Sequence, residues 1–260
     1  MKLRLLLIIS TLTVFFTSCA THQQLTYLQD IDESGTENFF PLDRPDYRIQ
    51  YQDILYIRFY TLNAEINEML NGSNQVSTTQ LFNNEAGYYI NGYNVNDSGY
   101  VTVPIIGDIQ VTGMTLDEAR KEIQKKAAVY LKDATVIVKL LSFKFSVIGE
   151  VNRPGTYRNL NNQLTVLEAI SMAGDITDYG DRSRVLVLRP ADNGTRTYRI
   201  DLKSKDLLSS EAFFLLPNDL VIVEPVDQKI LQLNLPTISL MVTAFFSTVS
   251  MTLLILNYLK

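Results

Sequence analysis

The sequence predicts an α+β protein: two small mixed domains followed by a C-terminal transmembrane α-helix. Strand-forming runs and short amphipathic helices alternate twice, over residues 46–141 and again over residues 142–227. Each half has one helix that begins with a threonine and a glutamate three positions later, which is the capping-box pattern. The last stretch, residues 228–260, has no charge between Lys229 and Lys260 and is long enough to cross the roughly 30 Å core of a bilayer.

The N-terminal segment has the features of a secretory signal peptide. Lys2 and Arg4 precede an apolar run over residues 5–16, which is too short to span a bilayer. Two small residues then lead into Cys19, the only cysteine of the chain, and this arrangement resembles a bacterial lipobox. The resemblance implies that residues 1–18 are removed and that Cys19 is lipidated. An ordinary signal peptide followed by an incidental cysteine is the alternative.

The composition narrows the list of partners. The formal net charge is −5 over 260 residues, and removing the signal peptide makes the chain more acidic. Nucleic-acid binding is normally marked by a basic patch, so we expect no nucleic-acid partner. Residues 19–45 are predicted to be a tether between the lipid and the first domain.

The first domain is predicted to begin with a strand that directly follows Asp53. An irregular insertion over about residues 62–96 is rich in Asn, Ser and Gly, and a strand near 100–104 comes next. A helix is expected from Thr115, and a strand over 136–141 closes the domain. The helix has apolar side chains at spacings of three and four: Leu116, Ala119, Ile123, Ala127 and Leu131.

The second domain is predicted to repeat the α+β construction. A strand over 145–150 is followed by a turn at Pro154-Gly155 and by a short helix from Thr165. Asp192-Asn193-Gly194 marks a β-hairpin, because this type of sequence favours tight turns between strands. The last strand follows Asp219, as the first strand of the other domain follows its own aspartate.

Several stretches resemble the outer-membrane polysaccharide export proteins. Residues 99–119 read Gly-Tyr-Val-Thr-Val-Pro-Ile-Ile-Gly-Asp-Ile-Gln-Val-Thr-Gly-Met-Thr-Leu-Asp-Glu-Ala, which is similar to the motif of the family's first domain. Residues 147–157, 164–174 and 216–223 resemble the soluble-ligand-binding β-grasp (SLBB) domain. One departure is the sequence Gln50-Tyr51-Gln52, which stands where the family has a glycine before the first strand.

The resemblance implies a function in the export of capsular polysaccharide or exopolysaccharide. Members of this family are outer-membrane lipoproteins with periplasmic domains, and they form rings in which C-terminal helices make a pore. The implied partners are further copies of this chain, the polysaccharide, and an inner-membrane polysaccharide co-polymerase with tyrosine-kinase activity. We therefore expect an oligomeric conduit. A monomeric glycan-binding envelope lipoprotein without a pore is the alternative.

The expected C-terminal helix has a polar stripe. At 100° per residue, five side chains fall within one narrow sector of the helix: Ser239, Thr243, Ser247, Ser250 and Asn257. Such residues either line a pore or allow close packing between helices. A simple anchor, whose hydroxyls bond to their own backbone, is the third interpretation.

No catalytic constellation is evident in the sequence. His22 is the only histidine and lies in the predicted tether, so neither a histidine-based triad nor a His-rich metal site is expected. We predict no enzyme activity, no metal and no cofactor, although a glycosidase that uses only carboxylates stays open. A discrete ligand site in the β-grasp domain stays open as well.

Overall fold

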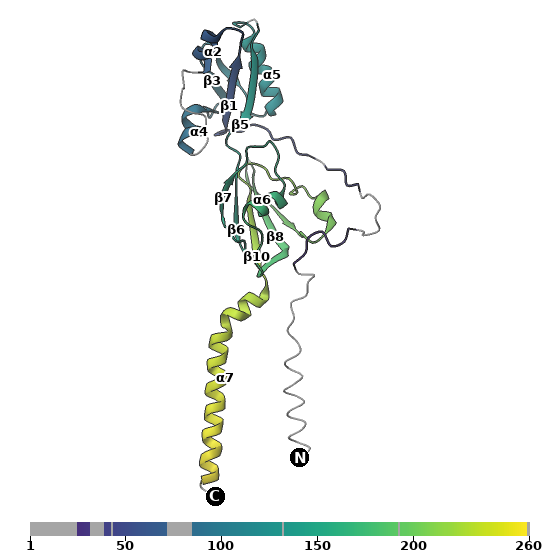
Figure 1. Ribbon diagram of the computed structural model, residues 1–260, viewed down its shortest axis with the longest axis vertical. Coiled ribbons are helices and arrows are strands. Elements are labelled where there is room, and N and C mark those ends of the chain that lie inside the picture. Colours follow the sequence, from purple (N-terminus) through teal and green to yellow (C-terminus); the bar gives the residue numbers. More distant parts are fainter. Residues whose placement is uncertain are drawn as a thin grey trace.

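The computed structural model describes residues 25–31, 39–42, 44–71, 85–131, 133–191 and 193–258. The signal peptide, Cys19 and His22 lie outside these residues, so lipidation stays a prediction. Figure 1 shows two domains and a long C-terminal helix that follow one another along the long axis.

A three-stranded antiparallel sheet, in the order β2-β1-β5, forms the centre of the first domain. Its strands are β1 (Ile54–Tyr60), β2 (Tyr93–Asn94) and β5 (Thr135–Leu140). Alternate side chains of β1 are buried, as the apolar alternation after Asp53 predicts. A separate hairpin is formed by β3 (Tyr100–Val103) and β4 (Gly107–Gln110).

The predicted helix of the first domain is α5 (Leu116–Ala127), and it packs against β5. Both capping-box hydrogen bonds are present: the Glu118 amide donates to the Thr115 hydroxyl, and the Glu118 carboxylate accepts from the Thr115 amide. The helix buries Ala119, Ile123 and Ala127, which belong to the predicted apolar face.

The segment predicted as an irregular insertion contains two short helices, α2 (Ala64–Asn71) and α4 (Glu85–Asn91). Asparagines tie α2 to β1, because the Asn71 side chain accepts a hydrogen bond from the Phe59 amide and donates one to the Phe59 carbonyl. Asparagine is common in loops and disfavoured inside helices. The asparagines that hold this helix in place are therefore also the reason why the sequence predicts an irregular segment here.

The second domain has a five-stranded mixed sheet in the order β7-β6-β10-β8-β9. The central strand β10 (Leu220–Pro225) runs parallel to β6 (Lys144–Gly149) and antiparallel to β8 (Gly180–Ala191). Strands β7 (Gly155–Arg158) and β9 (Gly194–Ile200) form the two edges, and β8 and β9 make the predicted hairpin.

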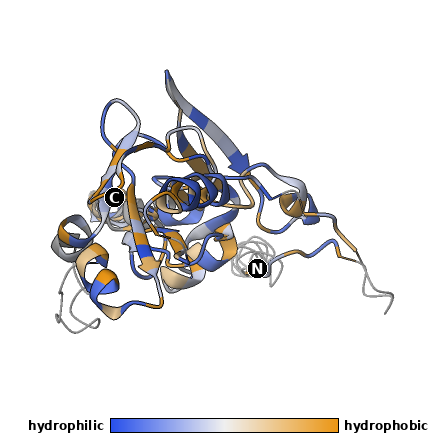
Figure 2. Cartoon of the chain, turned by 90° about the horizontal axis from the view of Figure 1, so that it is seen from above, coloured by the Kyte–Doolittle hydropathy of each residue, from blue (hydrophilic) through white to orange (hydrophobic). Residues whose placement is uncertain are grey.

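Two short helices complete the second domain: α6 (Val166–Met172) and the 3-10 helix η2 (Lys205–Ser209). The capping box of α6 forms between Thr165 and Glu168, as predicted. Seen from above in Figure 2, hydrophilic and hydrophobic residues alternate along the elements, which is the pattern of sheets and helices with one buried face.

The C-terminal helix α7 runs from Asp227 to Tyr258. Within the described residues, no helix combines the length and the apolar character needed to cross a membrane. The prediction of a transmembrane helix over residues 228–260 is therefore wrong. The physical reason is the composition of this helix: charged residues stand in its first turn, and hydroxyl and amide side chains interrupt the apolar residues of the remainder.

Candidate functional site

The described residues contain no group of His, Cys, Asp or Glu side chains that could hold a metal ion. The candidate functional features among the described residues are instead three pockets and two buried aspartates. They lie where the two domains meet and on the face of the second domain.

The two domains contain the same turn before a strand. Asp53 and Asp219 are both buried, and each accepts a hydrogen bond from the backbone amide three residues earlier, at 2.9 and 2.8 Å. The preceding residues, Gln52 and Asn218, have φ values of 69° and 68°, in the left-handed region that non-glycine residues rarely adopt. The sequence pattern that the two domains share, an aspartate directly before a strand, therefore corresponds to the same turn structure in both.

Asp53 also connects the first domain to the link between domains. Its carboxylate accepts hydrogen bonds from the Tyr47 hydroxyl at 2.7 Å and from the Ser142 hydroxyl at 2.8 Å. Burial raises the pKa of Asp53 even though these bonds oppose the shift. Burial and the nearby Asp53 carboxylate likewise raise the pKa of Tyr47.

Asp219 has a different partner. Its carboxylate forms a buried ion pair with Arg189, with an N–O distance of 2.8 Å, and the Arg189 guanidinium also donates to the Phe214 carbonyl. Burial raises the pKa of Asp219, and the bonds from Arg189 oppose this shift. Removing either partner would leave a buried charge without its counter-charge.

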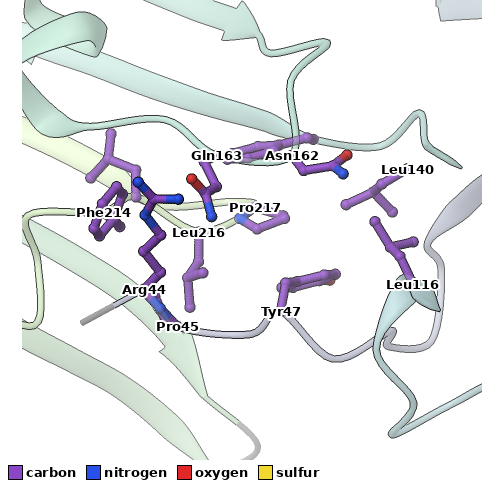
Figure 3. Close-up of a pocket in the computed structure, with 12 residues that line it drawn as sticks. Arg44, Pro45, Tyr47, Leu116, Leu140, Asn162, Gln163, Phe214, Leu216 and Pro217 are labelled. Carbon is purple, nitrogen blue, oxygen red and sulfur yellow. The ribbon is translucent and has the colours of Figure 1, made fainter. Parts of the chain in front are cut away.

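A small pocket lies between the domains (Figure 3). Tyr47, Leu116 and Leu140 line it from the first domain, and the Arg44 side chain extends toward Phe214 and Gln163. Its volume is about 20 Å³, enough for about one water molecule. This pocket therefore belongs to the packed contact between the domains, with room for little more than one water molecule.

An open groove lies at the same junction, and we call it the junction groove. It has a volume of about 300 Å³ and receives residues from both domains. Both left-handed turn residues belong to it. It is lined by Gln50, Tyr51, Gln52, Asp53, Ile54, Tyr89, Ser142, Lys144, Arg158 and Asn218.

A second groove, the hairpin groove, lies beside β8 and β9 and has a volume of about 450 Å³. The Arg189 guanidinium lies 5.2 Å from the centre of the Tyr198 ring, and the Tyr198 hydroxyl donates to Glu211 at 3.2 Å. The groove is lined by Pro41, Pro45, Arg189, Arg196, Tyr198, Leu208, Ser209, Ser210, Glu211 and Leu216.

The segment Leu25–Ile31 belongs to the predicted tether and lies against the second domain. Its backbone donates from Leu28 to the Leu202 carbonyl at 3.1 Å, and the Tyr27 hydroxyl donates to Asp175. Burial and the Asp175 carboxylate raise the pKa of Tyr27 to about 12. The Tyr27 ring covers the Arg182 guanidinium, which belongs to a residue that is 5% exposed.

The polar residues predicted on the C-terminal helix do lie on α7, where Ser239, Thr243, Ser247, Ser250 and Asn257 are all exposed. The Thr243 hydroxyl donates to the Ser239 carbonyl one turn earlier, as the simple-anchor interpretation expects. None of the five lines either groove.

Sequence reasoning missed the residues of the junction groove. The available signal was the sequence Gln50-Tyr51-Gln52, a departure from the family motif, since it places Tyr51 in the turn before β1. The cations of the groove, Lys144 and Arg158, carried no signal in the sequence because they lie on different strands.

Comparison with known proteins gives matches to both domains. Residues 42–141 match the family described as polysaccharide biosynthesis/export protein, and residues 143–223 match the SLBB domain. The EPS I polysaccharide export outer membrane protein EpsA of Ralstonia nicotianae is 36% identical over 104 residues, which are 38% of this chain and 27% of that protein. The version from Ralstonia solanacearum is 37% identical over 102 residues, again 38% and 27% of the two chains.

A third relative is the exopolysaccharide production protein ExoF of Rhizobium meliloti, which is 34% identical over 111 residues. The match covers 41% of this chain and 23% of ExoF. The chain thus spans only about a quarter of the length of these relatives.

Proposed function

Since the chain belongs to the family of polysaccharide biosynthesis/export proteins, we propose that it is a subunit of an oligomeric conduit for exopolysaccharide or capsular polysaccharide. The observation that carries this proposal is the succession of an export domain and an SLBB domain that share one continuous hydrophobic core. The relatives named as polysaccharide export and exopolysaccharide production proteins support it.

The proposed location is the outer membrane, with both domains in the periplasm and a lipid on Cys19 as the anchor. The name of the Ralstonia protein, an outer membrane protein, supports this location. The proposed partners are further copies of the chain, the polysaccharide and an inner-membrane polysaccharide co-polymerase with tyrosine-kinase activity. We propose no enzymatic step.

In this proposal the polar stripe of α7 is a contact between helices of neighbouring subunits. Beyond Lys229 the described side chains of α7 are exposed, among them Leu240, Met241 and Phe245, so the helix presents a large apolar surface to its surroundings. Small hydroxyl-bearing residues allow two helices to approach closely.

The test is the mass of the full chain after extraction in detergent, measured together with polymer secretion by cells that lack the chain. The conduit requires an oligomer of defined mass and a loss of secreted polysaccharide. A monomer in detergent would contradict the conduit. The second candidate is a glycan-binding lipoprotein, and the observation that supports it is the two grooves that a single chain already forms. A monomer that still bound glycan would favour this candidate.

A further inference from the structure

We infer that the junction groove binds an acidic sugar residue of the exported polymer. The inference rests on the proposed function, because the polymer supplies the ligand. Beyond that function, the inference names a binding site, assigns a negative charge to the polymer and identifies the residues that bind the charged sugar.

The first observation is a pair of like charges. Lys144 of β6 and Arg158 of β7 are directly opposite one another in the antiparallel pairing, and both line the groove. Like charges in this position destabilise a sheet. The Lys144 ammonium has no ion-pair partner among the residues that the structure describes. An anion at the Lys144 ammonium would provide the counter-charge that this side chain lacks among the described residues, which gives the groove a preference for carboxylate-bearing ligands.

The second observation is that the described part of the lining contains no competing anion. Asp53 is the only carboxylate among the lining residues that the structure describes, and it is buried and accepts hydrogen bonds from Tyr47, Gln50 and Ser142. The charge of Lys144 is therefore not offset within the described lining, although the net charge of the protein is negative.

The third observation is a pair of tyrosines that the first domain contributes to the lining. Tyr51 is 57% exposed and Tyr89 is 67% exposed, and both line the groove from the first domain. A tyrosine ring combines a flat apolar face with a polar hydroxyl, which suits a sugar ring with apolar C–H faces and hydroxyl edges. Tyr51 is in the turn that the buried Asp53 holds, so its backbone is fixed before a ligand arrives.

The remaining lining residues supply neutral hydrogen-bonding groups. Gln50, Gln52 and Asn218 are exposed, and their amides can both donate to and accept from sugar hydroxyls. The volume of about 300 Å³ is at the low end of the range for small-molecule sites, so the groove fits a short segment of a polymer.

The hairpin groove is larger but less suited to an anion. Its Arg189 is already paired with Asp219, and the carboxylate of Glu211 lies in the same lining as Arg196. The positive charge available to a ligand is therefore offset there, whereas it is not offset beside Lys144.

A conduit needs a site that releases its cargo as readily as it binds it. We therefore expect weak binding, with a Kd on the order of 1 mM for a short oligomer. Weak sites on successive subunits would still hold a long polymer through multivalency.

The test is a titration of the full chain in detergent with a galacturonate hexamer, with a neutral glucose hexamer and inorganic phosphate as comparison ligands at constant ionic strength. We expect the galacturonate hexamer to bind about tenfold more tightly than the glucose hexamer, and phosphate to compete poorly. Equal binding of the two hexamers, or full competition by phosphate, would overturn the inference.

Two variants locate the site. Lys144→Gln should weaken binding of the galacturonate hexamer about fivefold, and Tyr51→Leu should weaken it by a similar factor. Lys125→Gln removes the same charge from an exposed position of α5 and should leave binding unchanged. Equal losses in Lys144→Gln and Lys125→Gln would contradict the site. The melting temperature of Lys144→Gln should not fall, because the substitution breaks no ion pair among the described residues.

The failure of this inference can be distinguished from the failure of the proposed function. If cells that lack the chain secrete normal amounts of polymer, the proposed export function fails. If secretion requires the chain but the Lys144→Gln protein binds the galacturonate hexamer as the unmodified chain does, only the acidic-sugar site fails.

Discussion

Single residues set the backbone geometry at the junction between the domains. Asp53 and Asp219 each hold a turn in which the preceding residue is left-handed, and both turn residues reach the junction groove. A glycine at position 52 would adopt this conformation without strain. Gln52 adopts it instead, and its side chain becomes available to the groove.

Gly149 gives the sharpest prediction for a single residue. Its φ is +91°, and a Cβ atom at this position would lie 2.1 Å from the Val223 carbonyl oxygen in the neighbouring strand. We expect Gly149→Ala to reduce the free energy of unfolding by about 3 kcal/mol or more, because the clash is with backbone. Chemical denaturation measures the change.

Gly155→Ala is the matched control. It is close to the same strand, but the atom nearest to the added methyl group would be 4.0 Å away. The free energy of unfolding should change by less than about 1 kcal/mol. Similar losses in the two variants would show that the backbone of Gly149 is not constrained as described.

At the scale of elements, the sequence predicts a helix best where the interactions that start the helix are between residues close together in the chain. The helices α5 and α6 begin at capping boxes whose two hydrogen bonds involve residues only three positions apart, so the pattern is sufficient. Helix α2 depends on contacts of its asparagines with β1, twelve residues away in the case of Phe59 and Asn71. Such contacts cannot be inferred from local spacing.

The start of α7 is joined to the second domain by an ion pair between Lys229 and Glu150, whose carboxylate also accepts from the Thr177 hydroxyl at 2.9 Å. The hydrogen bond from Lys229 lowers the pKa of Glu150 below its ordinary value of 4.5. The stabilisation is therefore present above this ordinary value, and it is lost as the pH falls through the lowered pKa.

Glu150→Gln should reduce the free energy of unfolding by about 1 kcal/mol at pH 7. The difference from the unmodified chain should shrink as the pH falls below 4.5, because protonation removes the same ion pair. Denaturation at several pH values measures it, with Glu68→Gln on the exposed face of α2 as the control. A difference that persists unchanged at pH 3 would contradict the role of the ion pair.

The docked segment Leu25–Ile31 yields a prediction about local dynamics. The amides of Leu28 and Gln29 donate to backbone carbonyls of the second domain, so their hydrogen exchange should be slow. Tyr27→Ala removes the ring that covers Arg182 and should accelerate this exchange at least tenfold, while Tyr27→Phe, which keeps the ring, should have a smaller effect. Fast exchange in the unmodified chain would show that the segment is not held.

On the scale of the whole molecule, the two domains share one hydrophobic core. Buried residues on both sides of the link, Leu140 and Phe143 among them, belong to the same continuous cluster. We therefore expect the two domains to unfold in one cooperative transition, with coincident midpoints by near-ultraviolet and far-ultraviolet circular dichroism.

Phe143→Ala tests this coupling, because Phe143 is only 3% exposed and lies in the link between the domains. It should reduce the free energy of unfolding by about 3–5 kcal/mol and separate the two domains into distinct transitions. Two transitions already in the unmodified chain would contradict a shared core.

The resemblance to polysaccharide export proteins is confirmed by the matches to both domains, and the α+β character of each domain is confirmed by the structure. The transmembrane helix is the prediction that failed. It relied on the missing charges after Lys229 and gave too little weight to the polar residues of the segment. The junction groove could not be predicted, since it brings Tyr51, Tyr89 and Lys144 together from separate elements.

Both described ends of the folded chain attach to the same domain. Leu25–Ile31 bonds to Leu202 and Lys203, and the beginning of α7 bonds through Lys229 to Glu150, so the two attachments are in the SLBB domain (Figure 1). A mechanical load applied between the N-terminal attachment and α7 would pass through this domain alone. The export domain lies outside this path, and its packing against the SLBB domain through the shared hydrophobic core would hold it in place while the attachments bear the load.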